Sequence, residues 1–98
     1  MIELRKTDEF ARWIDRLRDV CARARIQVRI QRLADGNPGY VRAVGEGVSE
    51  LKIDYGPGYR VYYTQRRGVF ILLLCGGDKS TQDSDIKHAL SLAREMED

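Results

Sequence analysis

The order of hydrophobic and polar residues in the first third of the chain predicts a strand followed by two helices. Residues 1–5 alternate apolar and charged positions, as a half-buried strand does. Thr7 or Asp8 can cap a first helix that runs to about Asp19, and a second helix covers residues 21–34. Each helix carries an apolar stripe at helical spacing, formed by Phe10, Trp13, Ile14 and Leu17 in the first and by Ala22, Ile26, Ile30 and Leu33 in the second.

From residue 40 the hydrophobic period changes to two, and glycine-containing turns divide the chain. The pattern predicts four strands, over residues 40–44, 48–55, 59–65 and 69–75, with turns at residues 45–47, 56–58 and 66–68. A last helix begins near Gln82 and buries Ile86, Ala89, Leu90 and Ala93. The expected fold is a single α+β domain over residues 1–98. It has an N-terminal strand and a helical hairpin packed on an antiparallel β-meander, and a short C-terminal helix.

Length and composition set aside several classes of protein. The 98 residues are 43% hydrophobic and 33% charged, which is enough for one packed core. No apolar run approaches the ~18 residues that span a bilayer, and the first residues lack the apolar stretch of a signal peptide. Cys21 and Cys75 have no metal-ligand spacing and are expected to be reduced thiols. We therefore predict a cytoplasmic protein without a membrane segment, a disulfide or a zinc site.

The net charge of +2 is unevenly spread along the chain. Residues 1–35 hold nine Lys and Arg against six Asp and Glu, and residues 36–75 hold five against three. Residues 76–98 hold three against six. A basic body beside an acidic C-terminal helix could present a positive face to a polyanion. Ordinary solvated charge explains the same distribution.

The central hairpin gathers the largest set of reactive side chains. A turn symmetric about Pro57 places Asp54 opposite Arg60 and Lys52 opposite Tyr62. The polar face of the hairpin would then hold Glu50, Lys52, Asp54, Arg60, Tyr62 and Thr64. The plainer interpretation is a solvated sheet face with an exposed Asp54–Arg60 ion pair, worth less than ~1 kcal/mol.

Two further segments are candidate anion sites. Residues 76–81 follow the most apolar strand and precede a helix, where backbone N–H groups and Lys79 could bind an oxyanion. Ordinary helix capping explains that segment equally well. Arg25, Arg29 and Arg32 share one helical face and could contact a phosphate backbone, or they could simply be solvated.

Five segments carry a resemblance to a known family, and they are residues 10–14, 24–26, 36–37, 44–63 and 74–82. In this order they resemble the RelE/ParE superfamily of bacterial toxins from type II toxin–antitoxin modules. Within it the chain is most similar to the HigB-like branch, the addiction module killer proteins. The resemblance covers essentially the whole chain and implies a RelE-like fold.

The resemblance also implies a reaction and its residues. In the nuclease members a strand lysine, the arginine of a Gly-Tyr-Arg segment and a basic residue after the last strand lie on a concave sheet face. Lys52, Arg60 and Lys79 match these positions. The implied reaction uses no metal and no cofactor, because the RNA 2′-hydroxyl attacks its own phosphodiester. Lys52 would accept the proton, Arg60 would clamp the phosphate, and Lys79 would add charge or donate a proton.

Two sets of residues are candidate substrate contacts, the first suggested by the resemblance and the second by helical spacing. Tyr62 would stack on a base where some members use a tyrosine near the C-terminus, and the Arg25, Arg29 and Arg32 stripe would hold the RNA backbone. Asp54 stands where other members carry an extra cation.

Three functions stay open at this point. The chain is expected to be a ribosome-dependent mRNA endonuclease, a DNA gyrase inhibitor that acts by binding, or a degenerate antitoxin-binding module. The implied partners are a cognate antitoxin, of helix-turn-helix type and encoded by the adjacent gene, together with the ribosome and mRNA. No small-molecule cofactor and no membrane partner are expected.

Overall fold

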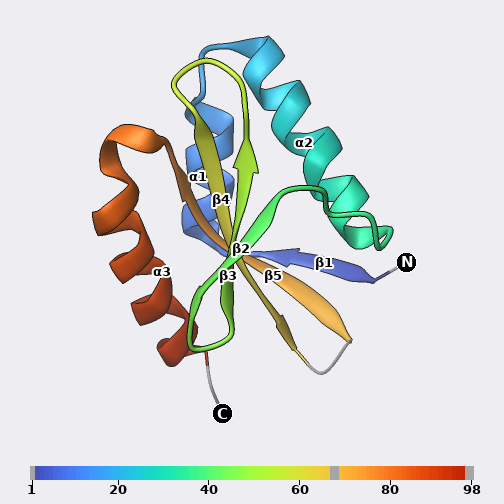
Figure 1. Ribbon diagram of the computed structural model, residues 1–98, viewed down its shortest axis with the longest axis vertical. Helices are drawn as coiled ribbons and strands as arrows, with labels where there is room; N and C mark the ends of the chain where they lie inside the picture. The colour runs from blue at the N-terminus through green and yellow to red at the C-terminus, as the bar shows by residue number, and fades with distance from the viewer. Residues whose placement is uncertain (1, 67–68, 97–98) are drawn as a thin grey trace.

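The computed structural model describes residues 2–66 and 69–96, which form three α-helices and one sheet of five strands (Figure 1). In chain order the elements are β1 (Glu3–Lys6), α1 (Asp8–Arg16), α2 (Val20–Ala34), β2 (Val41–Gly45), β3 (Val48–Ile53), β4 (Tyr59–Arg66), β5 (Phe70–Gly77), the short 3₁₀ turn η1 (Lys79–Thr81) and α3 (Gln82–Glu95). This confirms the predicted α+β order. Residues 67 and 68 of the predicted turn at 66–68 lie outside the described residues. None of the helices in the described ranges is both long and apolar enough to cross a bilayer.

Side-chain caps decide where the two helices of the hairpin begin. The Thr7 hydroxyl oxygen accepts a hydrogen bond from the Phe10 amide at 3.0 Å, which confirms the predicted cap of α1. The first helix ends at Arg16, earlier than the predicted end near Asp19. The reason is that Asp19 caps the next helix, since its Oδ1 accepts from the Ala22 amide at 3.1 Å.

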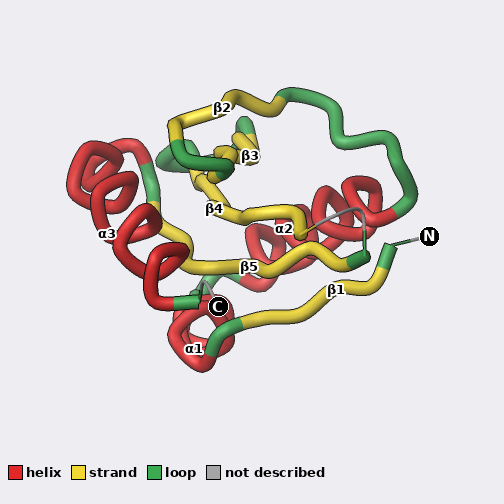
Figure 2. Tube along the Cα trace, turned by 90° about the horizontal axis from the view of Figure 1, so that it is seen from below, coloured by secondary structure: helices red, strands yellow, loops and turns green. Residues whose placement is uncertain are grey.

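The sheet has the strand order β1-β5-β4-β3-β2. Strands β2 to β5 form the predicted antiparallel meander. Strand β1 lies at one edge and pairs in parallel with β5, and β2 forms the opposite edge (Figure 2). The connection between these two parallel strands holds α1, α2 and strands β2 to β4, and within it the helical hairpin carries the chain from β1 to β2 at the opposite edge. Helices α1 and α2 are therefore the link that returns the chain to the far side of the sheet.

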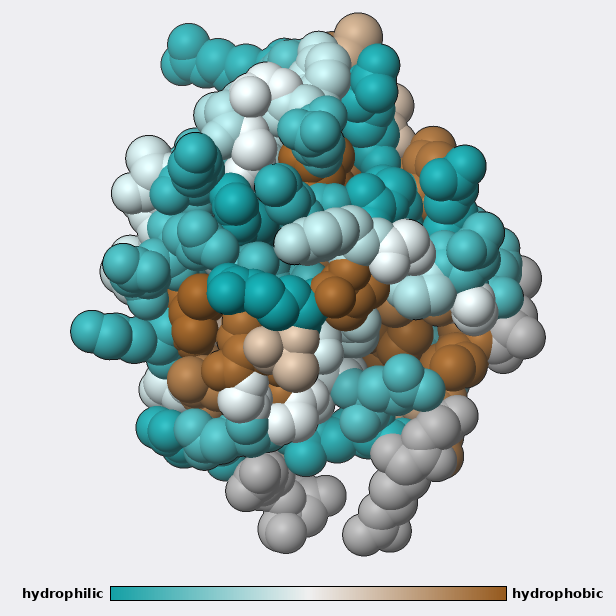
Figure 3. Space-filling view, in the orientation of Figure 1, coloured by the Kyte–Doolittle hydropathy of each residue, from teal (hydrophilic) through white to brown (hydrophobic). Residues whose placement is uncertain are grey.

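The two faces of the sheet bury different helices. One face packs against α1 and α2 through Phe10, Ile14, Ile26, Ile30, Leu33, Leu51, Ile53, Val61, Tyr63, Ile71 and Leu73. The other packs against α3 through Val48, Tyr62, Leu74, Cys75, Ala89 and Ala93. Figure 1 shows α3 and α2 on opposite sides of the strands. The residues of the predicted helix stripes lie in these two clusters, except Ala22, which is buried outside them. On the surface seen in Figure 3, hydrophobic side chains form separate patches among hydrophilic ones.

The register of the β3–β4 hairpin differs from the prediction by two residues. Lys52 lies opposite Arg60, and Ile53 lies opposite Tyr59, so the loop consists of the five residues 54–58. Its centre is Gly56, with φ of 56°, rather than Pro57. A shift of two residues keeps each side chain on its face, because the side-chain period of a strand is two. The predicted faces are therefore confirmed, and the predicted cross-strand pairs are wrong.

Candidate functional site

The three cations predicted from the resemblance come together at one end of the sheet. Lys52 on β3 is opposite Arg60 on β4, which in turn is opposite Gly77 on β5. Lys79 follows two residues after Gly77. A Cβ placed on Gly58 would lie 3.4 Å from Arg60 Nη1 and 3.6 Å from Lys79 Cβ, so this loop touches both side chains. The structure thus gathers Lys52, Arg60 and Lys79 around the β3–β4 loop.

Arg60 is buried, with 6% of its surface exposed. Its Nη1 donates a hydrogen bond to the Gly58 carbonyl at 2.8 Å. Its Nε lies 3.7 Å from Glu50 Oε2, which is an ion pair too long for a hydrogen bond, and this Nε has no hydrogen-bond partner. The predicted exposed pair with Asp54 is wrong, because the register shift leaves Asp54 in the loop, exposed to solvent. Arg60 is instead held inside the molecule by one carbonyl and one carboxylate.

The carboxylate that holds Arg60 is the centre of a buried polar network. Glu50 is buried, and its Oε2 accepts hydrogen bonds from the Tyr62 hydroxyl at 3.1 Å and from Gln82 Nε2 at 2.9 Å. Arg42 Nη2 lies 3.3 Å from Glu50 Oε1. A buried carboxylate is tolerated when donors and cations surround it, and here they come from β2, β4 and α3. The alternation of residues correctly predicted that Glu50 lies on the polar face of the hairpin. No feature of the sequence predicted that Gln82 and Arg42 contact Glu50.

Tyr62 is fully buried, with its ring among Val48, Leu74 and Ala89 in the cluster under α3. Burial, and next the charge of Glu50, raise the pKa of the Tyr62 phenol far above its ordinary value, so the hydroxyl stays a donor. The predicted stacking of a base on this ring does not fit the structure, because no face of the ring is open to solvent. Its physical role here is to donate to Glu50.

A different aromatic ring is available beside Lys52. Tyr40 is 63% exposed, and the Lys52 ammonium lies 5.6 Å from its ring centroid. Lys52 itself is half-buried. Sequence reasoning missed Tyr40, because nothing in its neighbourhood along the chain marks it as different from the other strand tyrosines.

The two glycines at the end of β5 serve packing. A Cβ on Gly76 would overlap the Trp13 ring, and a Cβ on Gly77 would overlap the Asp85 carboxylate. Both positions therefore need glycine, since any side chain would displace α1 or the first turn of α3. These glycines bring the backbone close to other side chains, and a phosphate would have to compete with Asp85 for this space.

Two donors just before α3, the Ser80 amide and the Thr81 hydroxyl, are already bound to carboxylates of the chain. The Ser80 amide donates to Asp78 Oδ1 at 2.8 Å, and the Thr81 hydroxyl donates to Asp85 Oδ2 at 2.6 Å. Asp78 caps the short 3₁₀ turn η1, whereas Thr81, the N-cap residue of α3, makes no capping hydrogen bond through its side chain, so the predicted capping of the last helix by Ser80 or Thr81 is wrong. Lys79 remains exposed at the edge of the site.

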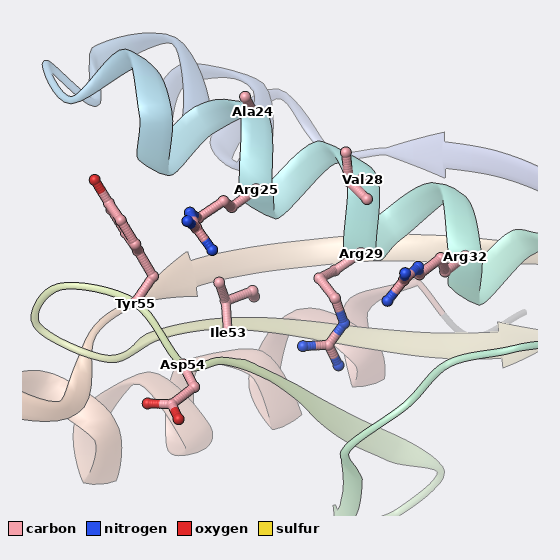
Figure 4. Close-up of a pocket in the computed structure, with 8 residues that line it drawn as sticks. All are labelled: Ala24, Arg25, Val28, Arg29, Arg32, Ile53, Asp54 and Tyr55. Carbon is pink, nitrogen blue, oxygen red and sulfur yellow. The ribbon is translucent and has the colours of Figure 1, made fainter.

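The predicted arginine stripe lines a separate groove between α2 and the β3–β4 loop, with a volume of about 380 Å³ (Figure 4). Arg29 is a structural residue, because its guanidinium donates to the Lys52 carbonyl at 2.7 Å and to the Pro38 carbonyl at 3.0 Å. Arg25 lies over the Tyr55 ring, 4.6 Å from its centroid, and remains exposed. Arg32 is also exposed. The stripe therefore divides into one arginine that binds backbone and two that face solvent.

Comparisons with known proteins show the family to which this chain belongs. The chain belongs to the phage-derived protein Gp49-like family (DUF891), a family of RelE-like toxins, which matches it over residues 2–97. A protein of Haemophilus influenzae strain Rd, described as uncharacterized, is 50% identical over 95 residues, which are 97% of this chain and 96% of that protein. No solved structure matches the chain. Family membership is consistent with the toxin of a toxin–antitoxin module and with an antitoxin partner.

Proposed function

We propose that the protein is the toxin of a type II toxin–antitoxin module, of the HigB-like kind, and that it cleaves ribosome-bound mRNA. The observation that carries the proposal is the meeting of Lys52, Arg60 and Lys79 at one end of the sheet. In the reaction, the RNA 2′-oxygen bonds to phosphorus as its proton passes to a base, and the bond from phosphorus to the 5′-oxygen breaks as that oxygen takes up a proton. The products are a 2′,3′-cyclic phosphate and a 5′-hydroxyl.

Arg60 is suited to stabilise the charge of the pentacoordinate phosphorus. The hydrogen bond to Gly58 and the ion pair with Glu50 hold the guanidinium in one place. A donor that is already oriented needs no reorganisation when charge develops, which makes it effective in a partly desolvated site.

Lys52 and Lys79 are the groups we assign to proton transfer. Lys52 is half-buried next to Arg60 in the sheet, and it takes the role of proton acceptor. Lys79 is exposed on the other side of the Gly58 loop, where it can reach the leaving oxygen. Tyr40 replaces Tyr62 as the ring for a base, because it is open to solvent and close to Lys52.

The test is expression of the chain alone in a bacterium, followed by mapping of mRNA 5′ ends. We expect growth arrest with new cuts inside codons, relieved when the adjacent gene is co-expressed. Lys52→Ala should lower the cleavage rate by roughly 10²-fold. Asp54→Ala is the matched control and should cleave like the wild type, since Asp54 is an exposed loop residue.

Two other outcomes would contradict the proposal. Double-strand DNA breaks without RNA cuts, unchanged in Lys52→Ala, would favour a gyrase inhibitor. Normal growth at verified soluble expression would favour a module that only binds an antitoxin.

A further inference from the structure

Helix α2 presents aliphatic side chains to solvent in a regular row. Val20 is 65% exposed and Val28 is 55% exposed, and Ala24 between them is exposed as well. These residues stand at i, i+4 and i+8, so they form one stripe along the outer surface of the helix. The opposite stripe of α2 is already packed in the core through Ile26 and Ile30. The helix thus has a second apolar row that nothing in the described chain covers.

The apolar row borders the groove between α2 and the β3–β4 loop. Ala24 and Val28 line one wall, and Ile53 and Tyr55 line the other (Figure 4). Arg29 stabilises the groove, because it ties α2 to the backbone of β3 and of the loop before β2. The groove is therefore part of the packed structure.

The charge around the groove is predominantly positive. Arg25 and Arg32 are exposed at its rim and Arg29 contributes a third cation, against the carboxylate of Asp54 in its lining and that of Asp19, which accepts from the Tyr55 hydroxyl. Carboxylates of a partner would therefore be attracted to the rim while apolar side chains enter between α2 and the loop. Arg25 and Arg32 are seven residues apart, which is two helical turns or roughly 10 Å along α2.

We propose that this groove docks an acidic amphipathic helical segment of the antitoxin, an inference that rests on the proposed toxin function. The segment would place two carboxylates about two turns apart, against Arg25 and Arg32. Its apolar side chains at i+3 and i+4 would contact the exposed Ala24 and Val28. This is the helix-in-groove mode of recognition, in which buried apolar anchors supply affinity and charges set the register.

Single-stranded RNA fits the groove less well. Its apolar lining is Ala24, Val28, Ile53 and the ring of Tyr55, whereas RNA binding relies on open aromatic faces for base stacking. The one aromatic ring that lines the groove, Tyr55, is covered by the Arg25 guanidinium, and its hydroxyl donates to Asp19 at 3.2 Å. A partner with both apolar and acidic side chains uses every feature of the groove.

The experiment measures binding of the purified full-length chain to the purified product of the adjacent gene, by isothermal titration calorimetry. Arg25→Glu/Arg32→Glu should weaken binding by at least roughly 100-fold, because two favourable charges become repulsive. Val28→Ser changes no charge and should weaken binding by roughly tenfold. Arg18→Glu/Lys87→Glu has the same change in net charge at exposed positions outside the groove, and it should bind within about threefold of wild type. The changed side chains are exposed, so thermal unfolding should confirm that every variant is folded.

The outcomes separate the docking surface from the proposed function. Binding of both groove variants at wild-type strength would overturn the docking proposal while leaving the toxin function standing. If the groove variants lost affinity for a fluorescent 12-nucleotide RNA but bound the antitoxin as the wild type does, the groove would be assigned to nucleic acid. That result would also overturn the docking proposal. Failure of the wild type to bind the neighbouring gene product would overturn the module and the docking proposal together. Cleavage of mRNA by the wild type, measured separately, tests the enzyme without reference to the groove.

Discussion

Arginines occur in two regions on either side of β3, and they are buried in one region and exposed in the other. Arg60 is buried at the end of the sheet, with its guanidinium set by the Gly58 carbonyl and the Glu50 carboxylate. Arg25 and Arg32 lie on the outer surface of α2 beside exposed aliphatic side chains. The same residue type is thus constrained in one region and left to solvent in the other.

The difference shows what each region is suited for. A cation that acts on a transition state gains from being held still, so that its orientation costs nothing during the reaction. A cation that recognises a partner can remain solvated until the partner arrives, and it then contributes to register and association rate. Burial and hydrogen bonding separate the two settings, whereas the number of positive charges does not.

The largest expected effect comes from Arg60→Ala. Cleavage should fall by roughly 10²–10³-fold, as when a positioned donor to a transition state is removed. The free energy of unfolding should also fall by about 3 kcal/mol, because buried Glu50 loses one of its two cations. In contrast, Arg25→Ala should cost no more than roughly 1 kcal/mol, the worth of an exposed cation–π contact. Urea unfolding and a ribosome-dependent cleavage assay measure the two quantities.

Two variants separate the catalytic loss from the structural one. Arg60→Lys keeps the positive charge near Glu50. Compared with Arg60→Ala, it should therefore recover most of the free energy of unfolding and little of the cleavage rate. Arg60→Ala/Glu50→Gln removes both charges and should be more stable than Arg60→Ala alone. Near wild-type cleavage by a folded Arg60→Ala protein would contradict the assignment of Arg60.

A smaller effect distinguishes the two tyrosines. Tyr62→Phe removes one buried hydrogen bond to Glu50 and should lower the free energy of unfolding by about 1 kcal/mol, with cleavage within about threefold of wild type. Tyr40→Ala should leave the unfolding midpoint nearly unchanged and reduce cleavage by roughly tenfold, as the loss of a base stack would. The reverse pattern would return the stacking role to Tyr62.

The smallest effect concerns the cysteines. Burial raises the pKa of Cys75 to about 12, and Cys21 is exposed. Iodoacetamide at pH 8 should therefore label Cys21 alone in the folded protein. An acid whose pKa is higher in the folded state stabilises the fold below the unfolded pKa, and this contribution is lost as the pH rises from about 9 towards 12.

The matching control is Cys75→Ala, whose unfolding midpoint should fall less steeply between pH 8 and 10.5 than that of the wild type. Equal slopes, or two labelled thiols in the folded protein, would show that Cys75 is accessible to solvent.

Much of the fold followed from local patterns. The cap at Thr7, the apolar stripes of the helices and the two-residue alternation in β3 and β4 predicted the order of elements and the face of each side chain. These features depend on residues within one or two turns of each other, which is why the chain's own pattern shows them. The grouping of Lys52, Arg60 and Lys79 came from the resemblance, and the strand register brings them together.

Only the tertiary structure decided the register of the β3–β4 hairpin, the burial of the polar side chains and the partners that they contact. Both Gly56 and Pro57 are plausible centres of the hairpin turn, and the choice moved Asp54 out of the strand pair. The network on Glu50 depends on Gln82, which lies 32 residues further along the chain. The division of the α2 arginines depends on where the carbonyls of Pro38 and Lys52 lie. Contacts of this kind form between segments whose distance along the chain carries no periodic pattern, and packing alone determines which of them meet.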